Sequence, residues 1–445
     1  MVDQIRVIRD GATKSVPASE LGSPAALDIL ARASQRARTN NYLDLPVYGA
    51  AGSPTAGETV TLSTNIDPVS GTAAAQTRFY NVTDADQSYY QATGGNPTGP
   101  IGNPASIQFP VSAPATNGFS GRIAWAMHFV TDAPNISIRL VLIANTKFQI
   151  LVDGQRVNDP TVIPNVASSG TYVRLEFAGR SAKGRVITVL CEKISGLMRV
   201  AVPQPYSIWR PTPLDAARGF VLGSSSTAAP SANVDADDTD SFAHLNYASR
   251  MMTYLGIYDR NNLGVSGTGH SVDGVNGKRF NDETRMDDVR ALLARGPLHF
   301  AAVQSSINDR DSAIADVSAN VLLTYQKLRA LLPSVPLFFF GAFPGNTGPS
   351  PDLLAVEQAV AAMVASQRAS DKLLAFIPVS TATPQPRIFG TGTAAAAGTG
   401  TGAGNADVYV KGDGTHPTWG ANGGHEKFAR IVTEGIRDAI TTMRG

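Results

Sequence analysis

The sequence predicts two domains, an antiparallel β-sandwich or jelly roll followed by a three-layer α/β domain with a parallel sheet. Its 445 residues exceed the roughly 250 to 300 residues that a single hydrophobic core normally holds. Residues 123–190 alternate apolar and polar positions with no helical pattern between the runs. After residue 218, by contrast, strand-like apolar runs alternate with helix-like ones, which is typical of a parallel sheet between helices.

The N-terminal half contains the predicted arm and the predicted β-sandwich. Residues 1–50 predict a short strand over 5–8 and a helix over 23–38, which we interpret as an attachment or assembly arm. Residues 51–205 form the β-sandwich domain, whose clearest strands are expected at 123–130, 136–143, 148–152, 172–177 and 185–190. Turn residues separate these strands, which favours antiparallel pairing. Such a module either binds carbohydrate or acts as a structural spacer.

The C-terminal half contains the predicted α/β domain, residues 218–445, after a proline-containing linker at 206–217. Strands are expected at 219–222, 263–265, 299–303, 335–340 and 373–379, and helices at 241–254, 283–293, 317–332, 353–366 and 421–443. Active sites in such sheets lie at the carboxyl ends of the strands. The Gly-, Thr- and Ala-rich tract 388–405 predicts a mobile loop near that edge.

Composition excludes several classes of partner. Charged residues make up 16% of the chain and the formal net charge is +1, which offers no electrostatic footprint for nucleic acid or an anionic membrane. No run of 18 apolar residues is present, and the N-terminus is charged where a signal peptide would be apolar. We therefore expect synthesis in the cytoplasm, with release by lysis or incorporation in a particle. The single Cys191 predicts a buried core residue.

Four segments of the second domain combine glycines with polar side chains: 223–227, 261–269, 303–309 and 411–420. In the first, three serines follow Gly223 at a strand end, where a sharp turn can expose a nucleophilic hydroxyl. The second contains Gly264, Gly267 and Gly269, which leave a backbone N–H unobstructed, and the third presents the side-chain amide of Asn308. In the fourth, Asp413 precedes His416 by three residues. A carboxylate so placed can orient an imidazole as a general base.

These segments, in their order and spacing, resemble the SGNH or GDSL-type hydrolase family over about residues 218–440. The family's motifs are G-D-S, a glycine in the second segment, G-x-N-D and D-x-x-H. The resemblance implies a flavodoxin-like sheet, no metal and no organic cofactor. It implies Ser225, Asp413 and His416 as the catalytic triad. It also implies an oxyanion hole made by the N–H groups of Ser225 and Gly267 with the Asn308 side chain.

Two positions depart from the family's motifs. Ser224 stands where the family has the aspartate of G-D-S, and Ser306 stands where it has the glycine of G-x-N-D. That aspartate is not the triad carboxylate, so its loss is expected to affect the geometry of the turn more than proton transfer. The row of three serines also leaves Ser224 and Ser226 open as alternatives to Ser225.

The resemblance implies a serine esterase with an acyl-enzyme intermediate, acting on an ester and most readily on O-acetyl groups of a glycan. The layout is also similar to that of phage tail proteins that deacetylate host polysaccharide. One alternative is a catalytically silent glycan-binding or structural protein with a decayed site, and another is an acyltransferase to a sugar. The arm or the β-domain offers a surface for a homo-oligomer.

Other residues have a functional and a structural interpretation. Trp419 and His270, together with Ser306, are candidates for substrate binding, but Trp419 is equally a packing residue and His270 a loop residue. We expect structural roles for the remaining histidines considered, His128, His244 and His425. The acidic cluster at 235–240 lacks the glycine and glutamate of a calcium-binding EF-hand loop, which favours a solvated loop.

Overall fold

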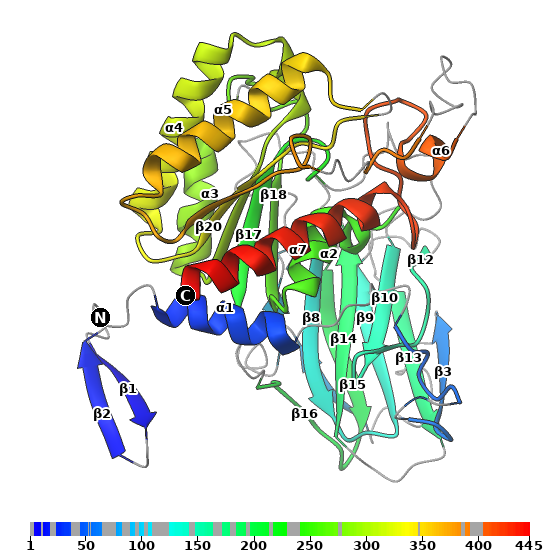
Figure 1. Cartoon of the computed structure of the whole chain (residues 1–445). Helices are drawn as coiled ribbons and strands as arrows, with labels where there is room; N and C mark the ends of the chain where they lie inside the picture. Colours follow the sequence, from blue (N-terminus) through cyan, green and yellow to red (C-terminus); the bar gives the residue numbers. More distant parts are fainter. Residues whose placement is uncertain are drawn as a thin grey trace.

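Two domains make up the protein, one from antiparallel sheets and one from a parallel sheet (Figure 1). The computed structural model describes residues 4–9, 12–17, 24–36, 45–51, 53, 55–64, 77–81, 90–93, 98–101, 106–108, 124–141, 147–162, 171–178, 184–192, 196–212, 217–228, 241–274, 278–345, 348–383, 388–391 and 404–445. The acidic cluster at 235–240 and most of the tract 388–405 lie outside the described residues.

The β-domain is a sandwich of two antiparallel sheets. One sheet contains β5 (Gln91–Thr93), β8 (Ala124–Thr131), β10 (Lys147–Val152), β11 (Gln155–Arg156), β12 (Thr161–Val162), β14 (Arg185–Glu192) and β16 (Ile208–Trp209). The other contains β3 (Thr59–Thr64), β4 (Thr77–Asn81), β6 (Thr98–Ile101), β7 (Ser106–Gln108), β9 (Asn135–Val141), β13 (Thr171–Ala178) and β15 (Gly196–Pro203). Alternate residues of both sheets, such as Ile138 of β9 and Phe129 of β8, share one core. The predicted two-residue period is therefore confirmed, and Cys191 is a buried residue of this core, as predicted.

The predicted linker begins inside the β-domain. Strand β16 pairs with the end of β8 and sets Ile208 opposite Thr131. Ile208 is only 1% exposed, so it belongs to the sandwich core. The segment that connects the domains is therefore shorter than the predicted 206–217.

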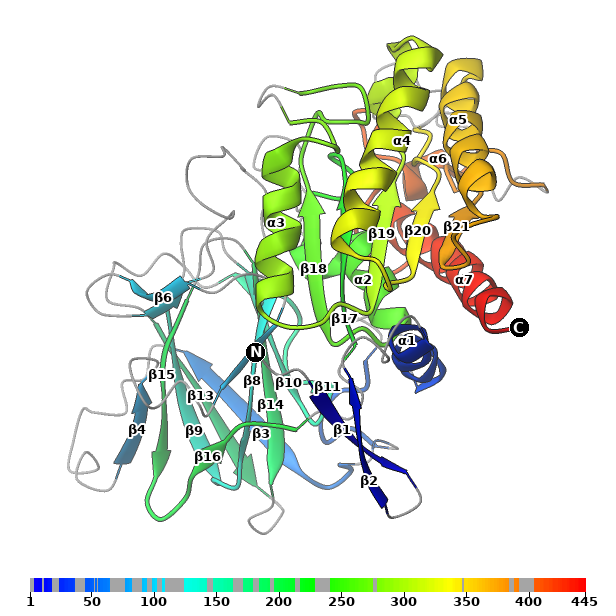
Figure 2. The ribbon, with the colours of Figure 1, turned by 90° about the vertical axis from the view of Figure 1, so that its left-hand side faces the viewer.

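The second domain has a parallel sheet in the order β18-β17-β19-β20-β21. These strands are β17 (Arg218–Gly223), β18 (Asp259–Gly264), β19 (Phe300–Gln304), β20 (Leu337–Phe340) and β21 (Leu374–Ile377). Helices α3 (Glu283–Ala294), α4 (Ile314–Leu331) and α5 (Pro351–Gln367) cover one face, and α2 (Tyr247–Tyr254) and α7 (Gly424–Arg444) cover the other (Figure 2). Phe220 and Leu222 pack with the first group, whereas Val221 packs with the second. Burial on both faces explains the continuous apolar runs.

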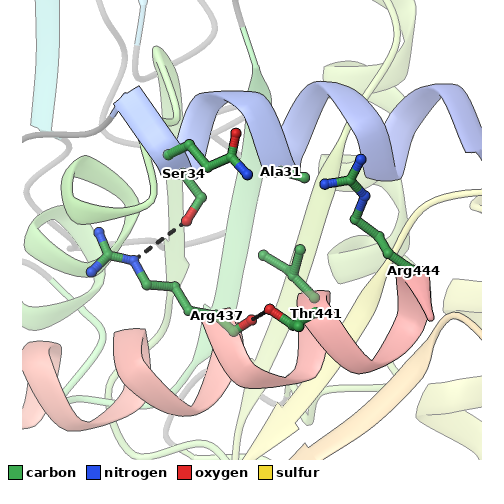
Figure 3. A pocket seen from close by; sticks show the side chains of 7 residues that line it. Ala31, Ser34, Arg437, Thr441 and Arg444 are labelled. Carbon is green, nitrogen blue, oxygen red and sulfur yellow. Dashed lines mark hydrogen bonds between the residues drawn. The ribbon is translucent and has the colours of Figure 1, made fainter.

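Helix α1 (Pro24–Arg36) is part of this α/β domain, although the sequence predicted it as part of a separate arm. Its buried face, including Leu30, joins the core formed by α2 and α7. Arg437 of α7 donates a 3.4 Å hydrogen bond to the Ser34 hydroxyl, beside a groove of about 530 Å³ between the two helices (Figure 3). A Cβ at Gly256, just before β18, would lie 2.2 Å from the Ala33 carbonyl oxygen. Helix α1 and this groove therefore lie at the amino ends of the strands.

An antiparallel hairpin of β1 (Gln4–Arg9) and β2 (Ala12–Pro17) precedes α1, and its second strand was not predicted.

Within the described ranges, no helix combines the length and apolar character needed to cross a membrane. The same residues contain no group of three or more His, Cys, Asp or Glu side chains arranged to hold a metal ion.

Candidate active site

The four polar segments meet at the carboxyl edge of the parallel sheet. Strands β17, β18 and β19 end at Gly223, Gly264 and Gln304. Parallel neighbours bring such ends to one edge, and the Val265 N–H donates to the Gly223 carbonyl at 3.0 Å. The fourth segment precedes α7. A Cβ at Gly345, in the loop after β20, would lie 2.8 Å from the Gly414 carbonyl oxygen and 3.8 Å from Ile307 Cδ1, so the third and fourth segments flank the same loop.

The turn after β17 presents one of its three serines. Ser224 and Ser226 are 1% and 3% exposed, whereas Ser225 is only partly buried. The Thr227 N–H donates to the Ser224 carbonyl at 3.0 Å, which closes a tight turn at the strand end. A Cβ at Gly223 would lie 1.9 Å from Thr227 Oγ1, so glycine is required there. This geometry favours Ser225 as the hydroxyl that a substrate can reach.

Three N–H donors lie in the first three segments. Gly267 has a φ of 76°, a left-handed conformation that glycine adopts without strain. In the part of the chain that the structure describes, the N–H groups of Ser225 and Gly267 donate to no protein acceptor. Asn308 Nδ2 donates to the Thr268 carbonyl at 2.9 Å, which uses one of its two hydrogens. Among the described residues, two backbone N–H groups and one side-chain N–H of these segments are therefore left without a protein acceptor.

Ser306 is a buried residue whose hydrogen bonds hold the third segment in place. It is fully buried, and its hydroxyl donates to the Thr268 carbonyl at 2.8 Å and accepts from the Asn308 N–H at 3.1 Å. Asp309 accepts from the N–H groups of His270 and Ser271, just after the second segment, at 2.8 and 2.9 Å, and burial raises its pKa. The prediction that Ser306 contacts substrate is therefore wrong, because its hydroxyl is enclosed and holds Asn308.

His270 and Trp419 also lie in the interior rather than on a substrate wall. His270 is 0% exposed, its ring centroid lies 4.9 Å from that of Phe280, and burial lowers its pKa to about 3. Trp419 is 5% exposed and packs with Phe242 and Leu190 in a cluster between the two domains. The packing interpretation of Trp419 is thus the one that the structure supports.

Asp413 and His416 are joined by a direct hydrogen bond. His416 Nδ1 lies 2.5 Å from Asp413 Oδ2, while Asp413 Oδ1 accepts from the N–H groups of Thr415 and His416 at 2.8 and 2.9 Å. Burial alone would raise the pKa of Asp413, but these hydrogen bonds outweigh it and hold that pKa well below its usual range. An ionised Asp413 keeps the proton on Nδ1, and Nε2 of His416 is then an acceptor.

Among the described residues, no hydrogen bond joins Ser225 to His416. Such contacts are often long in unliganded sites and shorten when substrate binds.

Sequence analysis missed three residues that link the elements carrying Ser225 and His416, namely Asn246, Arg250 and Glu426. An asparagine inside the predicted helix 241–254 was a usable signal of a helix N-cap. Nothing in the sequence pairs Arg250 with a glutamate 176 positions away.

Solved structures share this fold. A salicylyl-acyltransferase from a tetracycline biosynthetic pathway has a TM-score of 0.55 at 14% identity, over 81% of this chain and 97% of its own. A family two carbohydrate esterase from Cellvibrio japonicus has 0.55 at 14%, over 82% and 98%. A GDSL-like lipase from Bacteroides ovatus has 0.51 at 15%, over 83% and 98%. No family model and no curated protein matches the sequence.

The structural matches extend over both domains. Residues 218–445 make up only about half of the 445-residue chain, so a match over 81% or more must include much of the β-sandwich. Identities of 14 and 15% establish the fold alone. The protein therefore has the two-domain architecture found in carbohydrate esterases, a GDSL-like lipase and an acyltransferase.

Proposed function

We propose that the protein is a serine esterase that acts on a carbohydrate through Ser225, His416 and Asp413. The observation that carries this proposal is that Ser225 is partly exposed whereas Ser224 and Ser226 are buried, at the edge that also holds the Asp413–His416 pair. The backbone N–H groups of Ser225 and Gly267, which donate to no acceptor within the described ranges, supply donors of the kind that acyl transfer requires. The fold shared with carbohydrate esterases supports the same conclusion.

In the first half of the reaction, Ser225 Oγ attacks the ester carbonyl carbon while His416 Nε2 takes its proton. The carbonyl electrons move onto oxygen. The backbone N–H groups of Ser225 and Gly267 and the side-chain amide of Asn308 stabilise that charge. The tetrahedral intermediate then collapses. The C–O bond to the alcohol breaks, the alcohol receives the proton from His416, and the acyl group stays on Ser225.

In the second half, water replaces the alcohol. His416 takes a proton from water as its oxygen attacks the acyl carbon, and the same three donors hold the new oxyanion. Cleavage of the acyl–Oγ bond returns the proton to Ser225 and releases the acid. Throughout, Asp413 fixes the proton on Nδ1 and stabilises the imidazolium that forms.

The substrate class that we propose is an O-acetylated polysaccharide. One structural neighbour is a family two carbohydrate esterase from Clostridium thermocellum solved in complex with cellohexaose, with a TM-score of 0.54 at 14% identity. A chain with a net charge of only +1 suits an uncharged glycan better than a polyanion. Acetate is the acid that such a substrate would release.

The test compares Ser225→Ala with Ser224→Ala and Ser226→Ala on p-nitrophenyl acetate and acetylated xylan. Loss of the nucleophile is expected to lower kcat by about four to six orders of magnitude. The two buried neighbours are matched controls and keep most of the activity. A folded wild type that releases no acid from either substrate would overturn the esterase and favour a silent binding protein. Equal loss in Ser224→Ala would overturn the assignment of Ser225.

Acyl transfer to a sugar hydroxyl is a second candidate, because one structural neighbour is an acyltransferase. The chemistry differs only in the nucleophile that attacks the acyl-enzyme. Product analysis in the presence of a sugar acceptor separates the two. An acylated sugar formed in place of free acid identifies a transferase, and free acid alone identifies an esterase.

A further inference from the structure

Helix α2 begins at an asparagine that holds the nucleophile turn. Asn246 is fully buried, and its Nδ2 donates to the carbonyls of Ser226 and Ala228 at 2.9 and 3.0 Å. Its Oδ1 accepts from the Ala248 N–H at 2.9 Å, which caps the helix. One side chain therefore fixes the turn that carries Ser225 to the first turn of α2.

The same helix holds the segment that carries His416. Arg250, also buried, donates to Glu426 of α7 at 2.8 Å and to the Gly420 carbonyl at 2.7 Å. Gly420 follows His416 by four residues. The contact therefore fixes the end of the segment 411–420, which we call the catalytic loop. The Tyr247 N–H adds a 3.2 Å hydrogen bond to His425 Nδ1. Helix α2 is thus bound to both the loop and the start of α7.

The β-sandwich in turn anchors α2. The short 3-10 helix η5 (Ala243–Leu245) directly precedes it. His244 Nε2 lies 2.9 and 3.0 Å from the carbonyl oxygens of Trp125 and Cys191, and the Ala243 N–H donates to Glu192 at 2.9 Å. Because two carbonyls can only accept, His244 Nε2 is the donor. Helix α2 is therefore a fixed support between the two domains.

We infer that Asn246 and Arg250 are positioning residues that set the separation of Ser225 and His416. The inference rests on the proposed esterase function. Neither side chain reaches substrate, because both are buried; each acts by fixing a backbone segment. Reacting groups must be held within a fraction of an ångström, and a misplacement of about 1 Å can lower a rate by about 100-fold.

Two substitutions remove these contacts with little other change. Asn246→Ser keeps an oxygen that can cap α2 but loses both donors to the nucleophile turn. Arg250→Lys keeps a cation beside Glu426 but lacks the second arm that reaches Gly420. Ser249→Ala is the matched control, since this residue lies on the same helix, is 2% exposed, and its hydroxyl donates to the Ala243 carbonyl and to no other acceptor among the described residues.

The experiment measures kcat and KM for p-nitrophenyl acetate and the rate at which a fluorophosphonate labels Ser225. In that labelling, Ser225 Oγ bonds to phosphorus, fluoride leaves, and His416 takes the serine proton. We expect Asn246→Ser and Arg250→Lys each to lower kcat and the labelling rate by about 10- to 100-fold. KM is expected to match that of Ser249→Ala, which keeps the wild-type kcat. Each variant loses buried hydrogen bonds, so its unfolding midpoint is expected to fall, and kcat is measured at a temperature well below that midpoint.

Each outcome decides the matter. Variants that keep the kcat of Ser249→Ala, or that change KM alone, overturn the positioning role while leaving the esterase intact. A wild type that neither turns over nor is labelled overturns the proposed function and this inference with it. Should Arg250→Lys fail to fold, Arg250→Gln removes the guanidinium arm that reaches Gly420 and leaves no buried cation, while Glu426 keeps its ion pair with Arg430; an unchanged kcat in that variant overturns the role of Arg250.

Discussion

Replacing Asp413 with asparagine removes the negative charge of the catalytic loop but keeps an acceptor for the hydrogen bonds that hold its turn. Asparagine keeps an oxygen for the N–H groups of Thr415 and His416, which lie 2.8 and 2.9 Å from Oδ1, so the loop is expected to keep its turn. The other carboxylate oxygen, 2.5 Å from His416 Nδ1, becomes an amide nitrogen. His416 must then accept at Nδ1 and carry its proton on Nε2. In that tautomer it cannot take a proton from Ser225.

The effect on activity is expected to exceed the effect on stability by far. A wrong tautomer in a Ser-His-Asp triad lowers kcat by about 10⁴, which corresponds to about 5 kcal/mol of transition-state stabilisation. The depressed pKa of Asp413 means that folding favours its ionised form. The side chain is 36% exposed, however, so solvent screens the pair and its loss costs less than about 1 kcal/mol.

Steady-state hydrolysis of p-nitrophenyl acetate and thermal unfolding of the same samples check this expectation. Thr415→Ala is the control, because its hydroxyl makes only a 3.5 Å contact with the Asp413 carbonyl. If Asp413→Asn keeps most of the wild-type kcat, Asp413 does not orient the base. If the unfolding midpoint falls in proportion to kcat, Asp413 has a structural role and the reasoning about the tautomer fails.

Three other changes give separate tests. Asn308→Ala is expected to lower kcat by about 10² to 10³ with KM unchanged, because it removes an oxyanion donor. Burial raises the pKa of Asp288 to about 6, so the folded state holds a proton that the unfolded state releases, and the free energy of unfolding falls as pH rises from about 4 to 6. In urea titrations Asp288→Asn removes this fall, a gain of up to about 3 kcal/mol at pH 7, whereas exposed Asp287→Asn does not. Gly223→Ala is expected to lose about 1 to 3 kcal/mol of stability and most activity, because its Cβ would overlap Thr227 Oγ1 at 1.9 Å.

The α/β domain could be predicted from sequence because its signals are local. Phe220, Val221 and Leu222 are all buried, with alternate residues in opposite layers, so the strand appears as an unbroken apolar run. Helical periodicity follows each such run. The serines after Gly223 and the Asn308 amide could be proposed as candidates because they lie a few residues beyond strand ends, and the family resemblance then favoured Ser225 among the serines.

Burial of single side chains could not be predicted in this way. The aromatic ring of Trp419 is near the catalytic loop in sequence, but its packing partner Leu190 is more than 200 positions away. Ser306 occupies the position of a glycine in the family motif, and only the structure shows that its hydroxyl caps the segment that carries Asn308. The helix at 24–36 was predicted over 23–38, but no local signal identifies α7 as its packing partner, since Arg437 lies 403 positions after Ser34.

The position of Trp419 also bears on why the two domains occur together. Three residues after His416, this side chain is buried with Phe242 of the α/β domain and with Leu190 and Ala126 of the β-sandwich. Without the sandwich, these apolar side chains would face water, and the loop would lose the packing that fixes its path. The β-sandwich therefore contributes to the geometry of the site even if it binds no ligand.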